Sequence, residues 1–411
     1  MNNYQNRRNK LFENLAQGSL SILFSGSPVR KSADADYPFE ANRNFYYLTG
    51  IDEPEAVLVL IKTAQLEKSF LFIRDIDEMM EKWVGIYIRP QQAQEISGVD
   101  QVLFRSTFKD FLGRQLMFNA IDTLYLDGDR QRADARPLEG ERFALKMKKS
   151  YPLLNYRDLS NFVFSQRLIK DDQEIAKIRQ AIDITNKGLQ FMLKNMKPQQ
   201  FEYEYLADVR YIYNKHGASE MFDSIVASGP NGVILHYVSN DRKTSEGDLC
   251  LFDLGAKKEG YGADISRTYP VSGQFSERQK QLYTIVLGAM ERVKAFARPG
   301  VTLAQLTQQV IDYYGKALVE IGLIQDKSEV SKYYYHSVSH FLGLDTHDVG
   351  GSMGLMLEPG HVITNEPGLY IEEEQIGIRL ENDLLITENG CEDLCVDVPL
   401  SIADIESIMK R

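Results

Sequence analysis

Short apolar runs separated by polar, turn-forming stretches characterise the first part of the chain. Four runs have the length and the β-branched or aromatic content of buried strands, at residues 21–24, 56–61, 69–73 and 123–126. Helical patterns and turns lie between them, which predicts an α/β domain. No phosphate-cradling glycine loop follows these runs, and the chain has no histidine before His216. We therefore do not expect this half to carry the chemistry alone.

The clearest amphipathic helix follows, at residues 171–197. Asp171 can cap its first turn, and Glu174 three residues later completes the pattern of a capping box. An apolar stripe runs along one face, formed by Ile175, Ile178, Ile182, Leu189 and Leu193. Pro198 ends the pattern. We place the domain boundary just before this helix, with one domain at residues 1–168 and a second at residues 169–411.

Helices and strands alternate in the second domain. Three more helices are predicted, at residues 202–215, 276 to about 298, and 302 to about 322, the last two opened by Ser276 and Thr302. His216 is predicted to be an ordinary helix-terminal residue. The stretch SIVASGPNGVILHYVSND predicts a strand, a turn and a second strand that holds His236. From about residue 333 the pattern is β-rich and contains most of the remaining histidines.

Two acidic residues in the run LCLFDLGAKKEGYGADISR stand where a packed strand would not normally hold a charge. Asp253 and Asp264 lie in strand-like apolar stretches, and the turn-forming residues KKEGYG separate them. A turn centred between Lys258 and Glu259 would make them direct cross-strand partners, with side chains roughly 5 Å apart. Carboxylates at that spacing repel each other unless something neutralises them.

A second hairpin, in NEPGLYIEEEQIGIRLEND, repeats this arrangement. Glu366 and Glu381 are symmetric about a turn centred between Glu373 and Glu374. Two such hairpins facing each other would place four oxygen ligands around a small volume, which is the chemistry of a hard divalent metal site. The alternative is that all four are surface charges on edge strands, because charged side chains mostly stay exposed. The matched symmetry of the two pairs favours the metal site.

Three of the six histidines, His336, His340 and His347, fall within the run YHSVSHFLGLDTHDVGG. A helical zinc motif does not fit, because no glutamate follows His336 and the flanking glycines oppose a long helix. Each histidine taken alone could be a satisfied core or surface residue. Beside four candidate carboxylate ligands, the more economical interpretation is one imidazole ligand and two imidazoles that handle protons.

Composition and charge restrict the classes of function. The 411 residues, 43% of them hydrophobic, favour two or three globular domains. The net charge of −11 argues against a nucleic-acid partner or an anionic membrane surface. Neither a secretory apolar region nor a run of about eighteen apolar residues is present, so we expect a cytoplasmic protein. Cys250, Cys391 and Cys395 are too few and too unevenly spaced for a disulfide framework or a zinc ribbon.

These motifs resemble the pita-bread metallopeptidases, the group of methionine aminopeptidase, prolidase and aminopeptidase P. In that group five ligands recur in the order Asp, Asp, His, Glu, Glu, and the matching segments here are LFDLGA, GADISRT, HSVSHFLGLDTHD, NEPGLY and GIRLEND. The first part of the chain, beginning RRNKLFENLAQGS, resembles the N-terminal domain of bacterial aminopeptidases P. The resemblance implies an α/β N-terminal domain followed by an α+β pita-bread (creatinase/aminopeptidase) catalytic domain.

Carried over by position, the resemblance implies two divalent metal ions and five ligands. Asp264 and Glu381 match the residues that bridge both ions, Asp253 matches a ligand of one, and His340 and Glu366 match the ligands of the other. Glu366 also matches the group that accepts and donates the proton. Because carboxylates outnumber imidazole four to one, manganese is favoured, although the ligand order leaves cobalt, iron and zinc open.

Three histidines match positions that contact the substrate. His236 and His347 match residues that contact the scissile peptide and stabilise the tetrahedral intermediate, where an imidazole can donate to a developing oxyanion. His336 matches a residue that lines the proline-binding pocket.

The remaining matches concern support of the site and assembly. Arg379 and Tyr370 match a pair that orients carboxylates such as that of Asp253, with a plain salt bridge as the alternative for Arg379. Trp83, the single tryptophan, resembles an aromatic residue that reaches the site of a neighbouring subunit, although a lone tryptophan is more often part of a core. The resemblance implies a homo-oligomer, a dimer or a tetramer.

The function implied is that of a Xaa-Pro aminopeptidase, which acts on peptides with proline at the second position. The preference for proline comes from the resemblance alone. A prolidase restricted to Xaa-Pro dipeptides is the nearest alternative. Two others are a non-catalytic pita-bread binding module, which usually lacks some of the ligands, and a dinuclear phosphoesterase, whose site commonly has more histidines.

Overall fold

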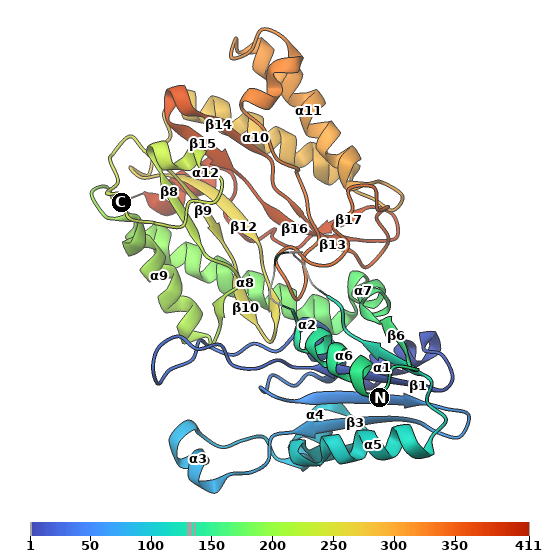
Figure 1. The fold of residues 1–411 in the computed structure, drawn as a ribbon. Helices are drawn as coiled ribbons and strands as arrows, with labels where there is room; N and C mark the ends of the chain where they lie inside the picture. Colours follow the sequence, from blue (N-terminus) through green and yellow to red (C-terminus); the bar gives the residue numbers. More distant parts are fainter. Residues whose placement is uncertain (1, 130–133, 135–136, 411) are drawn as a thin grey trace. The chain divides into compact units, whose positions relative to one another are not determined.

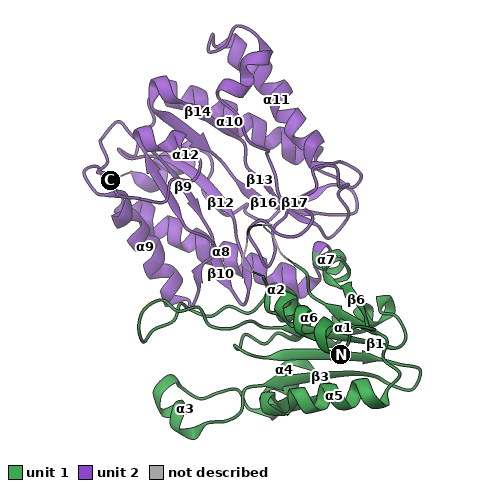
Figure 2. Cartoon of the chain, viewed as in Figure 1, with its two compact units in different colours: residues 1–167 green, residues 168–411 purple. Residues whose placement is uncertain are grey.

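The computed structural model describes residues 2–129, 134 and 137–410. The chain forms two compact units, Met1–Arg167 and Leu168–Arg411, which Figure 2 shows in green and purple. Each unit has its own sheets and its own buried core. None of the helices in the described part of the chain is both long enough and apolar enough to cross a membrane.

The first unit is built on a six-stranded mixed sheet with the strand order β4-β3-β2-β1-β5-β6 (Figure 1). The neighbours β1–β2 and β2–β3 are antiparallel, whereas β1–β5, β3–β4 and β5–β6 are parallel. The strands are β1 (Ser19–Phe24), β2 (Val57–Lys62), β3 (Glu67–Ile73), β4 (Gln101–Phe104), β5 (Thr123–Leu126) and β6 (Asn155–Asp158). The helices are α1 (Asn3–Asn14), α2 (Arg43–Thr49), α3 (Glu78–Val84), α4 (Pro90–Ser97), α5 (Phe108–Phe118), α6 (Glu139–Ser150) and α7 (Ser160–Leu168).

The central strands of this sheet are apolar because both of their faces are covered. All six residues of β1 are buried, and its side chains pack with β2, β3 and α5 in one core that includes Phe24, Phe72 and Phe108. The four strands predicted from apolar runs are confirmed to within two residues at each end. The strands β4 and β6 were not predicted, because they are edge strands with no fully buried side chain and therefore lack an apolar run.

The second unit combines short antiparallel ladders with two pairs of packed helices (Figure 1). The strand orders are β12-β9-β8, β11-β10-β7, β13-β16-β17 and β14-β15. The strands are β7 (Ser219–Glu220), β8 (Ile225–Ser228), β9 (Leu249–Leu254), β10 (Ala256–Lys258), β11 (Tyr261–Gly262), β12 (Ile265–Pro270), β13 (Val362–Asn365), β14 (Gly368–Ile371), β15 (Ile376–Arg379), β16 (Asn382–Ile386) and β17 (Cys391–Asp393). The helices are α8 (Asp172–Asn195), α9 (Glu202–Lys215), α10 (Glu277–Phe296), α11 (Leu303–Glu320) and α12 (Ile402–Met409).

The long helices begin where capping residues predict. The carboxylate of Asp171 accepts hydrogen bonds from the first backbone N–H groups of α8, and Glu174 accepts the N–H of Asp171 in return. Ser276 and Thr302 cap α10 and α11 in the same way. His216 is the C-cap of α9, and its Nδ1 lies 3.0 Å from the carbonyl oxygen of residue 212. These predictions are confirmed, except that α8, α10 and α11 each end about two residues early.

The first acidic hairpin has a different register from the one predicted. Its turn is centred between Glu259 and Gly260, which have φ angles of 49° and 84°. Two consecutive left-handed residues make the tight turn that suits a hairpin, and glycine adopts that conformation at no steric cost. In the observed register Asp253 lies opposite Ser266, so the prediction that Asp253 and Asp264 are direct partners is wrong. The two aspartates are diagonal neighbours instead.

The second acidic hairpin has the predicted register. The ladder β14–β15 pairs Gly368 with Arg379 and closes through a short 3-10 helix at Glu372–Glu374. The ladder β13–β16 continues in the same register. Glu366 and Glu381 lie opposite each other in the gap between these two ladders, because the N–H of residue 380 donates to the carbonyl of residue 367 at 3.2 Å.

Two segments predicted as strands are irregular. After β8 the chain forms a 3-10 helix, Gly229–Val233, and His236 lies in a turn rather than on a second strand. The strand ends there because Gly229 has a φ of 52° and the next residue is a proline, which has no N–H for a ladder. The histidine-rich stretch from residue 333 is likewise irregular, and regular strands begin only at β13.

Candidate metal centre and active site

A cavity of about 650 Å³ in the second unit collects the acidic and histidine side chains that the sequence singles out. The predicted residues that line it are Asp253, Asp264, His340, Glu366, Glu381, His236, His336, His347 and Arg379. Asp253 comes from β9, and Asp264 from the break between β11 and β12. Glu366 and Glu381 come from the break between the two ladders of the second hairpin. Three of these four carboxylates, those of Asp264, Glu366 and Glu381, therefore reach the cavity from interruptions in the ladders.

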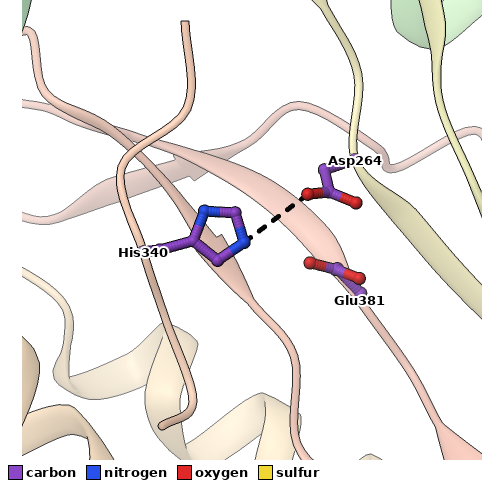
Figure 3. A group of neighbouring side chains, drawn as sticks. All are labelled: Asp264, His340 and Glu381. Atoms are coloured by element: carbon purple, nitrogen blue, oxygen red, sulfur yellow. Dashed lines mark ion pairs between the residues drawn. The ribbon is translucent and has the colours of Figure 1, made fainter. Parts of the chain in front are cut away.

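His340 lies among the carboxylates. Its Nε2 is 3.5 Å from Oδ2 of Asp264 and 3.5 Å from Oε1 of Glu366. Asp264, His340 and Glu381 each place a ligand atom within 4.8 Å of those of the other two, and in Figure 3 the imidazole points toward Asp264 with Glu381 beside it. The backbone of His340 is fixed to β13, because its N–H donates to Oγ1 of Thr364 at 3.1 Å and its carbonyl accepts the N–H of Thr364 at 2.9 Å.

The imidazole of His340 presents a lone pair to the carboxylates. Its Nδ1 lies 3.1 Å from the carbonyl oxygen of Phe341, and because a carbonyl can only accept, Nδ1 carries the proton. Burial, with the nearby His347 as the next cause, lowers the pKa of His340 to about 3. The ring is therefore neutral near pH 7 and its Nε2 is unprotonated, which is the form in which histidine binds metals.

The carboxylates of this group are too close and too buried to be charged together. Burial raises the pKa of Asp264 well above its ordinary value, and Glu381 and Asp253 add to the effect. Burial likewise raises the pKa of Glu381, with Glu366 and Asp253 as further causes. The pKa of Glu366 rises to about 8, because burial outweighs the lowering influence of Arg379. Oδ1 of Asp253 is buried and accepts no hydrogen bond from a described residue.

These features fit divalent metal ions held between the side chains. The facing atoms are carboxylate oxygens and one unprotonated nitrogen, so they are all acceptors with no donor between them. A cation would neutralise the carboxylates and accept the lone pair of the imidazole. Oxygen-rich sites with one imidazole suit hard divalent cations.

Arg379 orients one side of this group. Its guanidinium donates from Nη2 to Oδ2 of Asp253 at 2.6 Å, from Nε to Oγ of Ser266 at 2.9 Å and from Nη1 to the hydroxyl of Tyr370 at 3.2 Å. The guanidinium fork therefore fixes the direction of Asp253 and leaves its Oδ1 for another partner. Tyr370 does not itself line the cavity and contacts it through Arg379.

His336 continues this network. Its Nδ1 lies 2.8 Å from the carbonyl oxygen of Ser337 and carries the proton, so its Nε2 accepts the hydroxyl proton of Tyr370 at 2.9 Å. Burial lowers the pKa of His336 to about 4, which keeps the ring neutral. Aromatic rings surround it, with the ring of Tyr334 edge-on at 5.0 Å and that of Tyr370 tilted at 5.6 Å. His336 thus lines the cavity with two tyrosine rings packed against it.

Two polar residues that the sequence did not single out, Ser266 and Asp383, bind the predicted ligands Glu381 and Asp264. Oγ of Ser266 donates to Oε2 of Glu381 at 2.7 Å while it accepts from Arg379. Oδ2 of Asp383 accepts the backbone N–H of Asp264 at 3.2 Å. Each lies two residues after a predicted ligand, and the period of a strand places such residues on the same face. That spacing is the signal by which they could have been found.

His347 and His236 line the cavity from different segments. The ring centroid of His347 is 4.2 Å from that of His340, and burial lowers its pKa, with His236 as the next cause. The residue after His347 is Asp348, whose Oδ2 lies 3.1 Å from Nζ of Lys170 in an ion pair that is 1% exposed on each side. His236 is exposed in its turn.

Trp83 lies in the first unit, on helix α3, and 80% of its surface is exposed. Met79, Val84 and Ile86 beside it are also exposed. Trp83 is therefore not part of the core of its unit, which is the more common position for a lone tryptophan.

Comparison with known proteins identifies both units. Residues 176–388 match the model of metallopeptidase family M24, and residues 4–125 match that of the aminopeptidase P N-terminal domain. The chain is 37% identical to the Xaa-Pro aminopeptidase of Escherichia coli over 99% of this chain and 97% of that protein. It is 29% identical to human Xaa-Pro aminopeptidase 3 over 99% of this chain and 86% of that protein.

Solved structures agree with this result. A structure from Bacillus anthracis is 41% identical and matches with a TM-score of 0.97 over 100% of this chain and 99% of that chain. Zinc-substituted E. coli aminopeptidase P in complex with product is 35% identical and matches with a TM-score of 0.90 over 99% and 97%. The predicted fold class, an α/β domain followed by a pita-bread domain, is confirmed. The chain belongs to metallopeptidase family M24 and carries the N-terminal domain of the aminopeptidases P.

Proposed function

We propose that the protein is a Xaa-Pro aminopeptidase, a metallo-aminopeptidase that releases the N-terminal residue preceding proline. The observation that carries the proposal is the convergence of four carboxylates and the unprotonated Nε2 of His340 on one cavity. Relatives named Xaa-Pro aminopeptidase match along nearly the whole chain. Aminopeptidase P of E. coli has been solved with product, with the inhibitor Pro-Leu and with substrate, which supports a proline-containing peptide as the substrate here.

The ligand set would hold two divalent metal ions. In this proposal Asp264 and Glu381 would hold both ions, Asp253 would hold one of them, and His340 and Glu366 would hold the other. Bound divalent ions lower the pKa of a coordinated water and polarise a carbonyl oxygen. Four carboxylates and a single imidazole favour Mn²⁺ over softer ions.

The chain's own residues would handle the protons and the developing charge. Glu366 faces the cavity, with Oε1 3.5 Å from His340, and we assign to it the proton of the attacking water and its delivery to the proline nitrogen. His236 and His347 line the same cavity and can each donate an N–H to the oxyanion that develops on the scissile carbonyl. The neutral ring of His336, set among tyrosine rings, suits the apolar face of proline.

Arg379 and Tyr370 would act on the ligands rather than on the substrate. The guanidinium binds Asp253 directly and, through Ser266, the carboxylate of Glu381. Such partners hold metal ligands in one orientation, and their loss typically weakens metal binding or activity by about 10–100-fold.

Hydrolysis of short peptides by the purified protein tests this function. We expect turnover of a Xaa-Pro-Xaa tripeptide, no turnover of a matched Xaa-Ala-Xaa tripeptide, loss of activity with a chelator and recovery with Mn²⁺. Turnover confined to the Xaa-Pro dipeptide would favour a prolidase instead. Activity that is indifferent to the chelator would contradict the metal-dependent mechanism.

We also propose a homo-oligomer, a dimer or a tetramer, in which helix α3 contacts a second copy. The support is the exposed apolar surface formed by Met79, Trp83, Val84 and Ile86, since such surfaces mark interaction sites when several apolar side chains are contiguous.

A further inference from the structure

Glu202, the first residue of α9, is a buried carboxylate whose two oxygens are both occupied. Its Oε1 accepts from the backbone N–H of Ser228 at 2.6 Å, from the hydroxyl of Ser228 at 2.6 Å and from Nδ2 of Asn231 at 3.2 Å. Its Oε2 accepts from the hydroxyl of Tyr237 at 2.8 Å and from the backbone N–H of Arg242 at 2.9 Å. The side chain is 0% exposed and stands at a helix N-terminus, where the helix dipole favours a negative charge.

All of these donors belong to one stretch, residues 228–242, which we call the His236 segment. Leu235, His236 and Val238 of this segment line the cavity. Between residues 229 and 240 the described chain has a 3-10 helix and turns but no strand, so no sheet ladder holds this stretch in place. Glu202 instead binds it near both ends and also directly after His236, through Tyr237.

The position of His236 depends on this backbone. Its ring is exposed and forms no hydrogen bond with any residue that the structure describes. No hydrogen bond from its own ring to a described residue therefore holds the imidazole at the cavity wall. Two anchored side chains near it, those of Tyr237, the next residue, and Asn231, five residues before it, bind Glu202. A third, Asn240, four residues after it, binds backbone groups of Val226 and Ser224.

The network behind Glu202 is also continuous. The hydroxyl of Ser228 accepts from Nη1 of Arg242 at 2.7 Å, and the same nitrogen lies 2.6 Å from Oδ2 of Asp248. Arg242 thus links the two ends of the His236 segment, because it binds Ser228 and both residues bind Glu202. Removing the carboxylate would leave several buried donors facing one another, because each now shares this single acceptor group.

We infer that Glu202 is a positioning residue for the reaction, which holds the His236 segment so that His236 reaches the substrate carbonyl. This inference rests on the proposed function, because the role of His236 belongs to it. Glu202 itself does not line the cavity and does not touch the reacting atoms.

A double-substitution cycle tests the link to His236. Glu202→Gln keeps the shape of the side chain but turns one acceptor into an N–H₂ group that faces a donor. We expect it to lower kcat/KM by about 10–100-fold, mainly through kcat, since oxyanion stabilisation acts in the transition state. In a His236→Ala background the same substitution should lower kcat/KM by less than about 3-fold, because the group it positions is already gone. Losses that multiply in the double variant would overturn the inference.

Hydrogen exchange provides a test that does not depend on activity. Both Glu202→Gln and Tyr237→Phe should raise amide exchange in residues 229–242 and leave other peptides of the second unit unchanged. Tyr237→Phe removes one of the five donors, together with the contact of the same hydroxyl with Oδ1 of Asp241 at 2.9 Å, and serves if Glu202→Gln does not fold. Unchanged exchange in residues 229–242 for these variants would overturn the inference, whatever the substrate of the enzyme is.

Tyr205→Phe is the matched control. Tyr205 is also buried and lies on α9, but its hydroxyl donates to the carbonyl of Lys197 at 2.8 Å and bonds to Thr244 at 2.9 Å, outside the His236 segment. We expect it to lower the melting temperature without changing kcat or exchange in residues 229–242. If it lowers kcat as much as Glu202→Gln does, the role of Glu202 is general stability. Lack of wild-type activity toward Xaa-Pro peptides would instead refute the proposed function.

Discussion

Replacing Lys170 by methionine tests the buried ion pair behind His347. Nζ of Lys170 lies 3.1 Å from Oδ2 of Asp348, and both side chains are 1% exposed. Methionine keeps the length of the side chain and removes the charge that faces Asp348. Breaking a buried pair by removing one partner costs about 3–5 kcal/mol, because the remaining charge stays desolvated. For a domain of this size each kcal/mol corresponds to about 2–4 °C, so the melting temperature should fall by about 6–20 °C.

The same substitution should reduce activity. Asp348 directly follows His347, and its backbone N–H donates to the carbonyl of Phe341 at 2.9 Å, next to His340. A displacement of this loop by about 1 Å would lower kcat/KM by up to about 100-fold.

Thermal unfolding by circular dichroism, at a fixed metal concentration, gives the stability of Lys170→Met, Asp348→Asn and the double variant. The double variant should recover part of the loss, because no charge then remains buried without its partner. A melting temperature of Lys170→Met within about 2 °C of the wild type, or single losses that simply add, would refute the reasoning.

Three further predictions concern the metal centre and helix α3. Burial raises the pKa of Glu366 to about 8, so the folded, metal-free state binds more protons than the unfolded state between the ordinary glutamate pKa and about 8. The melting temperature of chelator-treated protein, measured by thermal shift, should therefore fall as pH rises through this window and recover when Mn²⁺ is added. A melting temperature that rises with pH would contradict this. Ser266→Ala removes the hydroxyl shared by the guanidinium of Arg379 and the carboxylate of Glu381, and should weaken Mn²⁺ binding measured by calorimetry by about 10–100-fold, whereas Thr284→Ala, on an exposed face of α10, should not. Trp83→Ala should change stability by less than about 0.5 kcal/mol but lower the molar mass measured by light scattering; an unchanged mass would remove α3 from the proposed interface.

The sequence by itself determined the elements whose causes are local. The caps of α8, α10 and α11 depend on side chains within about four residues of the helix start, so Asp171, Ser276 and Thr302 could be read directly. The apolar runs identified the central strands of the first sheet for the same reason. The symmetric positions of Glu366 and Glu381 about the EEEQ turn were enough to predict the register of the second hairpin, because its two ladders share one register.

Only the tertiary structure decided the rest of the site. The first hairpin depends on which residues of its turn adopt positive φ, and the sequence KKEGYG allows more than one centre. Ser266 meets Glu381 across 115 positions, and Lys170 meets Asp348 across 178. The five donors of Glu202 become its partners only when the His236 segment folds back onto the start of α9. Such pairings have no period in the sequence, because a buried polar group takes whichever partner the packed chain brings within hydrogen-bond distance.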